Sequence, residues 1–264
     1  MTTHELELVG RVRMTATLRV VSGLHIGAGK DTIEIGGVDN QVVKTPEGDP
    51  YVPGSSLKGK LRFLMEWAFG SIDPGGEPWG TNPRRTFDPA DPVLRIFGTP
   101  AKREQWAAGP TRLMVRDAMV DPQWRKETLD KGLLLTEAKT EVMIDRIAGK
   151  AHDRVGPRQT ERVPQQAAFG FEAVFRLYAV DGDGGARDRD CLGWTIQGLD
   201  LLEQDALGGS GSRGYGRIRF EDLALAGAGG DRVELDNVFR GHPFSRTAPP
   251  PPIMEKIEAV TGSG

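Results

Sequence analysis

One stretch near the start of the chain alternates apolar and polar side chains without a break: Arg11-Val12-Arg13-Met14-Thr15-Ala16-Thr17-Leu18-Arg19-Val20. A period of two is typical of a β-strand with one face buried and the other in solvent. The apolar residues all fall on one side of this strand, and the arginines and threonines fall on the other. The stretch therefore predicts a half-buried strand.

A helix is expected after the glycine-rich segment that follows this strand. Ser55 or Ser56 is suited to cap its start, because a serine hydroxyl can accept a hydrogen bond from a free N–H of the first turn. The apolar residues of this segment recur at helical spacing: Leu57, Leu61, Leu64, Met65 and Ala68. They would turn one face of the helix toward the core.

Four further elements complete the order. Residues 112–116 predict a strand, and the segment from Phe169 to Ala179 predicts a second strand of strict period two. Leu192, Ile196, Leu199, Leu202 and Ala206 outline a second helix that stops at Gly208. The segment from Tyr215 to Leu225 predicts a last strand.

The order strand, helix, strand, strand, helix, strand predicts an α+β fold with a ferredoxin-like (RRM-like) β-α-β-β-α-β core, in which two helices cover one face of an antiparallel sheet. We expect one domain over residues 1–230. The proline-rich residues 71–111 would form an insertion or lid, and residues 131–168 a protruding arm. The tail, residues 231–264, is expected to be extended because of its run of prolines.

Composition excludes several classes. The single Cys191 cannot form an internal disulfide or a multi-thiolate metal site, and four scattered histidines make a histidine-built metal site improbable. No stretch reaches the ~18 apolar residues needed to cross a bilayer, and the first residues do not read as a secretory signal. We therefore expect a cytoplasmic protein without membrane contact.

The charge balance of 34 basic and 37 acidic residues, a net charge of −3, argues against a nucleic-acid partner when the chain is taken as a whole. Basic residues nevertheless cluster in three places, at 54–63, 139–162 and 208–220. Each cluster can be a solvated face, which is the commoner fate of a charge run, or part of a surface that binds phosphate.

Glycine is enriched, with 35 of 264 residues against a usual level of about 7%. Gly209-x-Gly211-x-x-Gly214 matches the dinucleotide-binding pattern, but it lies between a predicted helix and a predicted strand rather than the reverse, so we reject that function. Residues 27–30 lack the remaining residues of a P-loop. No serine has the two flanking glycines of a hydrolase nucleophile.

The run from Pro53 to Arg62 is a candidate phosphate cradle. A helix N-terminus offers unpaired N–H groups and partial positive charge, and serine hydroxyls and cationic side chains surround it here. A well-capped surface helix with solvated lysines explains the same residues equally well.

Asp39 stands alone in a glycine-rich loop, Gly36-Gly37-Val38-Asp39-Asn40. Most such aspartates only bridge their own turn. If RNA crosses the loop, the carboxylate could instead hold a divalent ion near the scissile phosphate or take a proton from a ribose 2′-OH.

Taken together, the motifs resemble the RAMP superfamily, and most closely the repeated backbone subunit of type III CRISPR effector complexes of the Csm type. The resemblance covers nearly the whole chain and lies in the following segments: 24–27, 35–39, 51–62, 96–98, 144–146, 158–162 and 208–216.

The resemblance implies a metal-dependent endoribonuclease of antiviral defence. Copies of the chain would stack along a guide RNA beside other subunits of the complex, and each copy would cut the complementary target RNA once. Asp39 matches the catalytic aspartate, as metal ligand or as base, and the cofactor would be a divalent ion such as Mg²⁺. The arm matches a thumb that wedges between bases; its candidate residues are Met143, Ile144, Arg146, Arg158 and Arg162.

The resemblance also implies a set of guide-binding residues on the glycine-rich and basic segments. They are His25, Gly27, Ser55, Ser56, Lys58, Lys60, Arg62, Gly209, Ser210, Gly211, Ser212, Arg213 and Tyr215.

Two alternatives to the nuclease subunit stay open. One is an architectural guide-binding subunit in which Asp39 is structural. The other is a stand-alone nuclease for guide precursors, in which His25 would be the general base.

Overall fold

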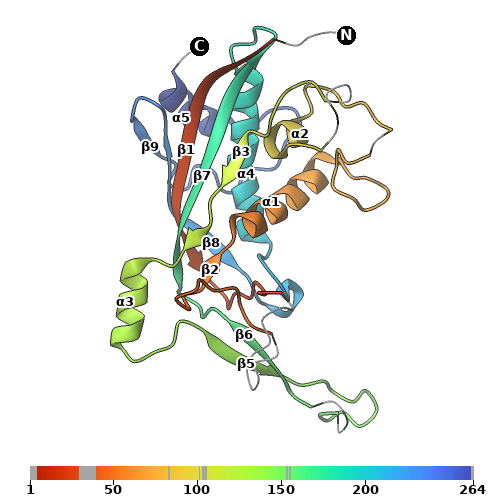
Figure 1. The fold of residues 1–264 in the computed structure, drawn as a ribbon, viewed down its shortest axis with the longest axis vertical. Helices are drawn as coiled ribbons and strands as arrows, with labels where there is room; N and C mark the ends of the chain where they lie inside the picture. The colour runs from red at the N-terminus through yellow and green to blue at the C-terminus, as the bar shows by residue number, and fades with distance from the viewer. Residues whose placement is uncertain are drawn as a thin grey trace.

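A five-stranded antiparallel sheet in the order β3-β7-β1-β8-β9 forms the centre of the computed structural model, which describes residues 5–29, 40–82, 84–100, 102, 106–152, 154 and 156–262. The central strand is β1 (Leu6–Val20), which lies between β7 (Ala168–Val180) and β8 (Ile218–Ala226). The edge strands are β3 (Leu113–Val115) and β9 (Arg232–Glu234). Figure 1 shows the long β1 and β7 side by side along the molecule.

The period-two prediction for β1 and β7 is confirmed. Val12, Met14, Leu18 and Val20 are buried, and Met14 pairs across the sheet with Ala173 of β7. The odd-numbered residues of β7 from Phe169 to Ala179 are buried as well. Both strands therefore bury the same face of the sheet, and the other face keeps their polar side chains.

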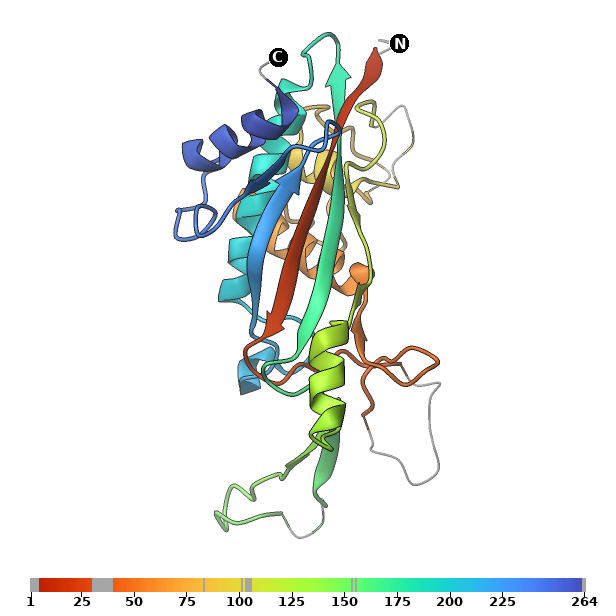
Figure 2. The same cartoon turned by 90° about the vertical axis from the view of Figure 1, so that its left-hand side faces the viewer.

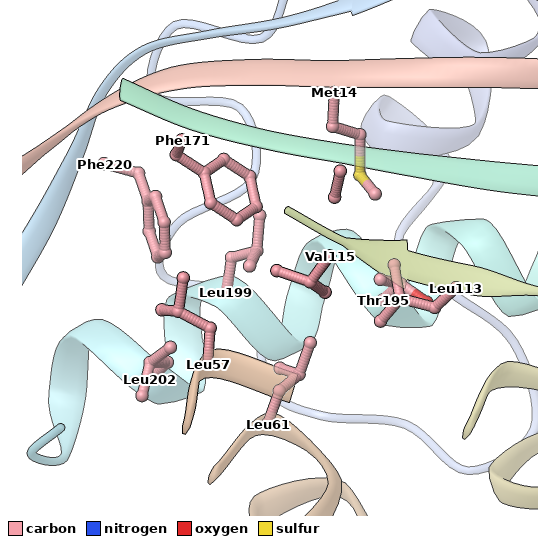
Figure 3. A pocket seen from close by; sticks show the side chains of 11 residues that line it. Met14, Leu57, Leu61, Leu113, Val115, Phe171, Thr195, Leu199, Leu202 and Phe220 are labelled. Atoms are coloured by element: carbon pink, nitrogen blue, oxygen red, sulfur yellow. The ribbon is translucent and has the colours of Figure 1, made fainter. Parts of the chain in front are cut away.

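Two helices cover the buried face, as expected: α1 (Gly54–Phe69) and α4 (Ala186–Gln204). In Figure 2 both lie behind the sheet strands. Leu57, Leu61 and Met65 of α1 are buried at spacings of four residues. Figure 3 shows the hollow where these helices meet Met14 and Phe171 of the sheet; at about 10 Å³ it holds one water molecule at most, so this region is core and not a ligand site.

Two helix boundaries differ from those expected. Neither Ser55 nor Ser56 caps α1, which starts after Pro53; the Asp117 carboxylate instead accepts a hydrogen bond from the Gly54 N–H at 2.7 Å. Helix α4 ends at Gln204 and not at Gly208, because the backbone leaves the helical region at Asp205. The last strand likewise begins at Ile218 rather than at Tyr215.

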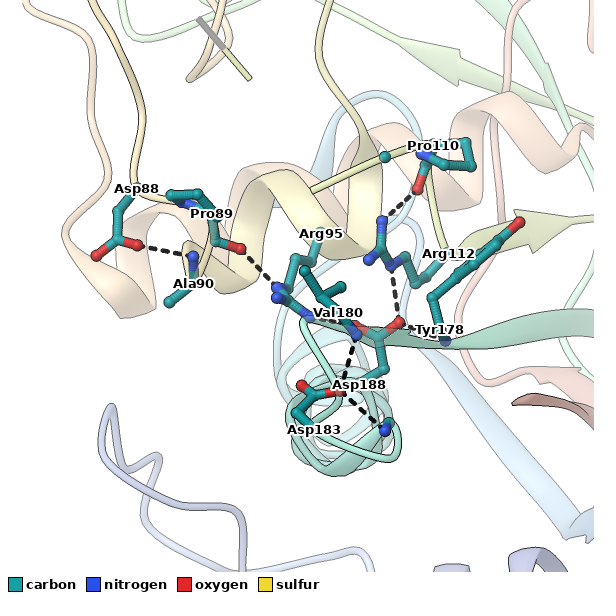
Figure 4. A network of polar contacts seen from close by, with 12 residues as sticks. Asp88, Pro89, Ala90, Arg95, Pro110, Arg112, Tyr178, Val180, Asp183 and Asp188 are labelled. Atoms are coloured by element: carbon teal, nitrogen blue, oxygen red, sulfur yellow. Dashed lines mark hydrogen bonds and ion pairs between the residues drawn. The ribbon is translucent and has the colours of Figure 1, made fainter. Parts of the chain in front are cut away.

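The segment 71–111 contains a helix that the sequence did not predict, α2 (Pro92–Phe97), whose Val93 and Ile96 join the main core. A buried ion network fixes it, as Figure 4 shows. Arg95 of α2 and Arg112, just before β3, each contact a different oxygen of Asp188 on α4 at 2.8 Å, and all three side chains are fully buried. The segment is therefore built into the fold at this point.

The arm begins after α3 (Pro122–Asp130), which the sequence also did not predict. It is a two-stranded antiparallel ribbon of β5 (Glu137–Glu141) and β6 (Arg158–Arg162). Figure 1 shows this ribbon projecting from the lower end of the molecule. A second small ribbon pairs β2 (Tyr51–Val52) with β4 (Ala118–Met119) between the sheet and the arm.

The prediction of an extended C-terminal tail is wrong. Residues 232–234 form β9 at the sheet edge, and α5 (Pro251–Thr261) packs Ile253, Ile257 and Val260 into the core. Proline in the first turn of a helix needs no N–H partner and already has a helical φ, so the prolines start α5 rather than prevent it. No helix in the described ranges is long and apolar enough to span a membrane.

Candidate nucleic-acid interface

Four segments that are distant in the sequence meet at the lower end of the sheet. Leu24 exchanges two backbone hydrogen bonds with Val163 at the base of the arm, at 2.8 and 2.9 Å. The Gly209 N–H donates to the His25 carbonyl at 2.8 Å, and Val43 N–H donates to the Ile26 carbonyl at 2.9 Å. Residues 23–27, 40–44, the arm base and residues 208–216 therefore form one structure.

Residues 208–216, the glycine loop, lie so close to the neighbouring backbone at Gly208 and Gly216 that a side chain would not fit at either position. A Cβ at Gly208 would lie 2.3 Å from the His25 carbonyl oxygen, and a Cβ at Gly216 would lie 2.0 Å from the Leu207 carbonyl oxygen. Both residues also have positive φ. Within the loop, the short 3-10 turn η1 (Gly211–Arg213) exposes Ser212 and Arg213. The predicted guide-binding loop thus presents a hydroxyl and a guanidinium at the surface.

Tyr215 joins the glycine loop to the arm. Its ring is only 2% exposed, and its hydroxyl donates to Glu141 Oε1 of β5 at 2.9 Å. Lys139 and Arg162 lie over the ring, with their cationic centres 4.4 and 5.2 Å from its centroid. The Tyr215 hydrogen bond, ahead of the charge of Lys139, lowers the pKa of Glu141. These contacts favour an anchoring role for Tyr215 and Arg162 over the RNA contact expected from the sequence.

Glu161 of β6 ties residues 40–44 to the arm. Its carboxylate accepts hydrogen bonds from the Val42 N–H at 3.0 Å, from Lys44 Nζ at 2.5 Å and from the Thr136 hydroxyl at 2.6 Å. Its own N–H donates to the Asn40 carbonyl at 2.9 Å. Burial by itself would raise the pKa of Glu161, but the hydrogen bonds from Lys44, Thr136 and Val42 lower it overall. Glu161 is therefore held as a carboxylate.

His25 lies half-buried against this anchor. Its Nδ1 is within 2.7 Å of the Glu161 carbonyl oxygen, so it carries the proton and donates. Gly27, also predicted to contact RNA, is exposed and bridges to Val42. One ring nitrogen of His25 is thus committed to the fold.

A groove of about 610 Å³ lies between the arm and the glycine loop. Three arginines line it: Arg146, Arg158 and Arg213. Within the described parts of the chain, Arg146 and Arg158 have no ion pair, and Arg213 reaches Glu141 only at 3.8 Å. The predicted arm residues Met143 and Ile144 line the same groove and are 44% and 49% exposed. Exposed apolar groups beside unpaired guanidinium groups suit a ligand that has both flat bases and phosphates.

The start of α1 is arranged differently. Lys58 Nζ donates to the Leu113 carbonyl at 2.9 Å, and burial, with nearby Arg62 and Arg176, lowers its pKa. Arg62 donates to Glu66 at 2.7 Å and to the Trp79 carbonyl. Lys60 pairs with Asp205 at 3.2 Å. These three cations serve contacts within the chain, and Asp117 occupies the anion position at Gly54.

The remaining predicted residues here are the two serines. Ser55 is exposed and Ser56 is half-buried. Among the described residues, neither serine forms a hydrogen bond with the glycine loop, and neither lines the arm groove.

Asp39, the predicted catalytic residue and metal ligand, lies outside the described residues. Asn40, which follows it in the sequence, is the residue held by Glu161. Among the residues that the structure describes, no group of three or more His, Cys, Asp or Glu side chains is placed to hold a metal ion.

Sequence reasoning missed the anchoring residues Lys44, Thr136, Lys139, Glu141 and Glu161. The only signal was the alternation of charge in residues 137–141 and 158–162, where the antiparallel register brings Glu137 opposite Arg162. The charge alternation of β5 and β6 can be seen in the sequence, but the contacts of the arm with residues 40–44 cannot be predicted from it.

Comparison with known proteins gives consistent matches. The RAMP superfamily model matches residues 17–219. The CRISPR system Cms endoribonuclease Csm3 of Methanocaldococcus jannaschii is 38% identical over 226 residues, which is 84% of this chain and 83% of that protein. The protein of the same name from Mycobacterium tuberculosis is 34% identical over 231 residues, covering 83% of this chain and 90% of the relative.

A solved structure gives the same indication. A chain in the crystal structure of the Csm3-Csm4 subcomplex in the type III-A CRISPR-Cas interference complex is similar with a TM-score of 0.51 and 26% identity, covering 87% of this chain and 90% of that one. The chain therefore belongs to the RAMP superfamily and, within it, to the family of Csm3 endoribonucleases of CRISPR systems.

Proposed function

We propose that this chain is the RNA-cleaving, guide-binding backbone subunit of a type III CRISPR complex, and that it cuts RNA complementary to the guide at regular intervals. The groove between the arm and the glycine loop carries the proposal, because it combines exposed apolar side chains with arginines that have no ion pair shorter than 3.8 Å among the described residues. The names of the curated relatives, all endoribonucleases, support the activity.

The finer description of the fold belongs to the same proposal. The four strands β8-β1-β7-β3 with α1 and α4 on one face follow the order of a ferredoxin-like core, to which β9 adds an edge. We interpret residues 71–111 as a lid that is partly built into the core, and the arm as the thumb.

The groove suggests how the chain prepares RNA for cleavage. Attack by a ribose 2′-OH needs the attacking oxygen, the phosphorus and the leaving oxygen in line, which continuous A-form stacking prevents. Met143 and Ile144 can separate neighbouring bases at an unstacking cost of a few kcal/mol, comparable to that of base flipping. Arg146, Arg158 and Arg213 would hold the flanking phosphates. Contacts to backbone and shape alone accept any guide sequence.

Asp39 is the proposed catalytic residue of this reaction, as a metal ligand or as the base for the 2′-OH. A divalent ion, for which we propose Mg²⁺, would supply charge stabilisation at the phosphate. The anchor at Glu161 fixes Asn40 and residues 42–44, so the chain that follows Asp39 has a defined position relative to the arm.

The partners that follow are a guide RNA, a complementary target RNA, further copies of this chain and other subunits of the complex, in the cytoplasm. Participation of other subunits is supported by the structural neighbour, which was solved as a Csm3-Csm4 subcomplex.

The experiment is target cleavage by the assembled complex with Mg²⁺. We expect evenly spaced fragments from the unmodified complex, and loss of cutting with retained target binding for Asp39→Ala. Asp130→Ala is the matched control, because Asp130 is an exposed carboxylate on α3 without an ion pair among the described residues. Unchanged cutting by Asp39→Ala would refute the assignment of Asp39.

The two alternatives give different outcomes. An architectural subunit would leave the target intact even in the unmodified complex. A guide-processing nuclease would cut repeat RNA as a purified chain without metal; because His25 donates its Nδ1–H to the Glu161 carbonyl, Nε2 is the atom that would act as the base in that activity.

A further inference from the structure

The open face of the sheet has a second basic groove, which the proposed function does not use. It has a volume of about 640 Å³ and lies over β1, β8 and the loop of residues 227–230. Arg11 and Arg13 of β1 and Arg232 of β9 line it, together with small and apolar residues such as Val174 and Ala226. We name it the sheet groove; none of the described residues that line it is acidic.

The strand register concentrates positive charge here. Arg11 is directly opposite Arg176 of β7, and Arg13 and Arg232 both pair with Ala226 of β8, from its two sides. Like charges opposite each other on a sheet are destabilising. Crossing from β7 to β9 covers three strand spacings, or about 14 Å at ~4.8 Å each. The arginines therefore form a band across the strands.

Within the described chain, two of these arginines have no ion pair and a third has only a distant one. Arg11 and Arg13 have no ion pair or hydrogen bond through their side chains, and Arg232 comes only within 3.9 Å of Glu234. On the same face, Arg19 shows the contrast, because it forms a 2.9 Å ion pair with Glu221. The sheet groove thus keeps charge that the fold compensates elsewhere.

The sheet groove is separate from the arm groove. Arg13 precedes the end of β1 at Val20 by seven residues, which at ~3.3 Å per residue is about 23 Å along the strand. The interface at Gly23 to Gly27 begins only beyond that end. One RNA-binding surface therefore cannot include both sets of arginines within a few nucleotides.

The lining favours a phosphate backbone over a protein partner. The guanidinium group binds phosphate oxygens in a bidentate manner. A protein interface relies on large apolar or aromatic anchors at its centre. None of the large exposed apolar residues of the described chain lines this groove, whose apolar groups are the half-buried Val174 and the buried Leu225 with small neighbours.

We propose that the sheet groove binds the phosphate backbone of an RNA strand without regard to sequence, as a second contact surface remote from the arm groove. This binding requires neither cleavage nor guide pairing. A failure of the proposed function would therefore leave it unaffected, and its own failure would not affect the proposed function.

The test is fluorescence anisotropy of a labelled short oligouridylate with the full chain over a series of salt concentrations. The variant Arg11→Ala/Arg13→Ala/Arg232→Ala removes three phosphate contacts. At ~0.7 per contact for single strands, the slope of log K against log salt should fall in magnitude by about 2. A control that removes the same charge elsewhere, Arg84→Ala/Lys126→Ala/Arg187→Ala, should leave the slope near that of the unmodified chain.

Equal slopes for the groove variant and the unmodified chain would overturn the proposal. Tighter binding of polyglutamate than of oligouridylate, lost in the groove variant, would overturn it in favour of an acidic protein partner. If the alanine variant does not fold, crosslinking of the unmodified chain to 4-thiouridine RNA decides instead: adducts in peptides containing Arg11 to Arg13 or residues 227–232 support the proposal, and their absence rejects it.

Discussion

The basic residues of this chain fall into two sets that look alike in the sequence and differ in what they face. Lys58 and Arg62 of α1 turn inward and bind backbone carbonyls and Glu66. Arg146, Arg158 and Arg213 line an open groove and have at most one distant carboxylate. A cation that the fold needs for its own carbonyl oxygens is not available to a ligand. The difference shows that a basic cluster indicates an RNA surface only where the chain leaves it without partners.

The most deeply buried cations are Arg95 and Arg112, which pair with Asp188. Substitution of Asp188 is expected to have the largest effect on the free energy of unfolding. Asp188→Asn would leave Arg95 and Arg112 buried without an opposite charge, which costs about 3–5 kcal/mol of unfolding free energy. Denaturant unfolding measures this loss. RNA affinity per folded molecule should not change, because the network lies inside the fold.

Asp190 on the same helix is the matched control. Burial raises the pKa of Asp190, and Asp190 has no ion pair within the described chain. Asp190→Asn should therefore be neutral or slightly stabilising. Similar losses for the two variants would contradict the inward assignment of Arg95 and Arg112.

A smaller loss of unfolding free energy is expected from substitution of Glu161, which anchors the arm and is not proposed to contact RNA. Its folded pKa lies below the ordinary value, so its stabilisation is present above the ordinary carboxyl pKa of ~4.3 and is lost as the pH falls through the lowered folded value. Glu161→Gln keeps the shape but loses the charge opposite Lys44, at a cost of about 1–3 kcal/mol at neutral pH. Unfolding free energy should then depend less steeply on pH in the acid range. The same acid dependence in both proteins would mean that Glu161 is not the anchor.

Much of the fold was predictable from the sequence because it depends on local periodicity. The alternation in β1 and β7 and the helical spacing of Leu57, Leu61 and Met65 each need only a few neighbouring residues, and all are confirmed. The tail was mispredicted because the run of prolines was taken to indicate an extended chain, although Pro251 begins a helix whose Ile253 and Ile257 are buried.

The site was predictable only in part. The glycine loop and the arm were identified, and the structure brings them together through Tyr215 and Glu141. The inward orientation of the Lys58 side chain depends on the carbonyl of Leu113, a residue 55 positions away, and no local sequence pattern predicts such a contact. Long-range partners of charged side chains are therefore the information that the sequence lacks.

The most direct test compares the two sets in one experiment, as the salt dependence of guide-length RNA binding to the full chain. For Arg146→Ala/Arg158→Ala/Arg213→Ala we expect the slope to fall in magnitude by about 2 and the unfolding free energy to stay the same. For Lys58→Ala/Arg62→Ala we expect an unchanged slope and a loss of stability, because two sets of internal hydrogen bonds disappear. A reduced slope for the second variant and an unchanged slope for the first would contradict the assignment of the arm groove as the RNA-binding surface.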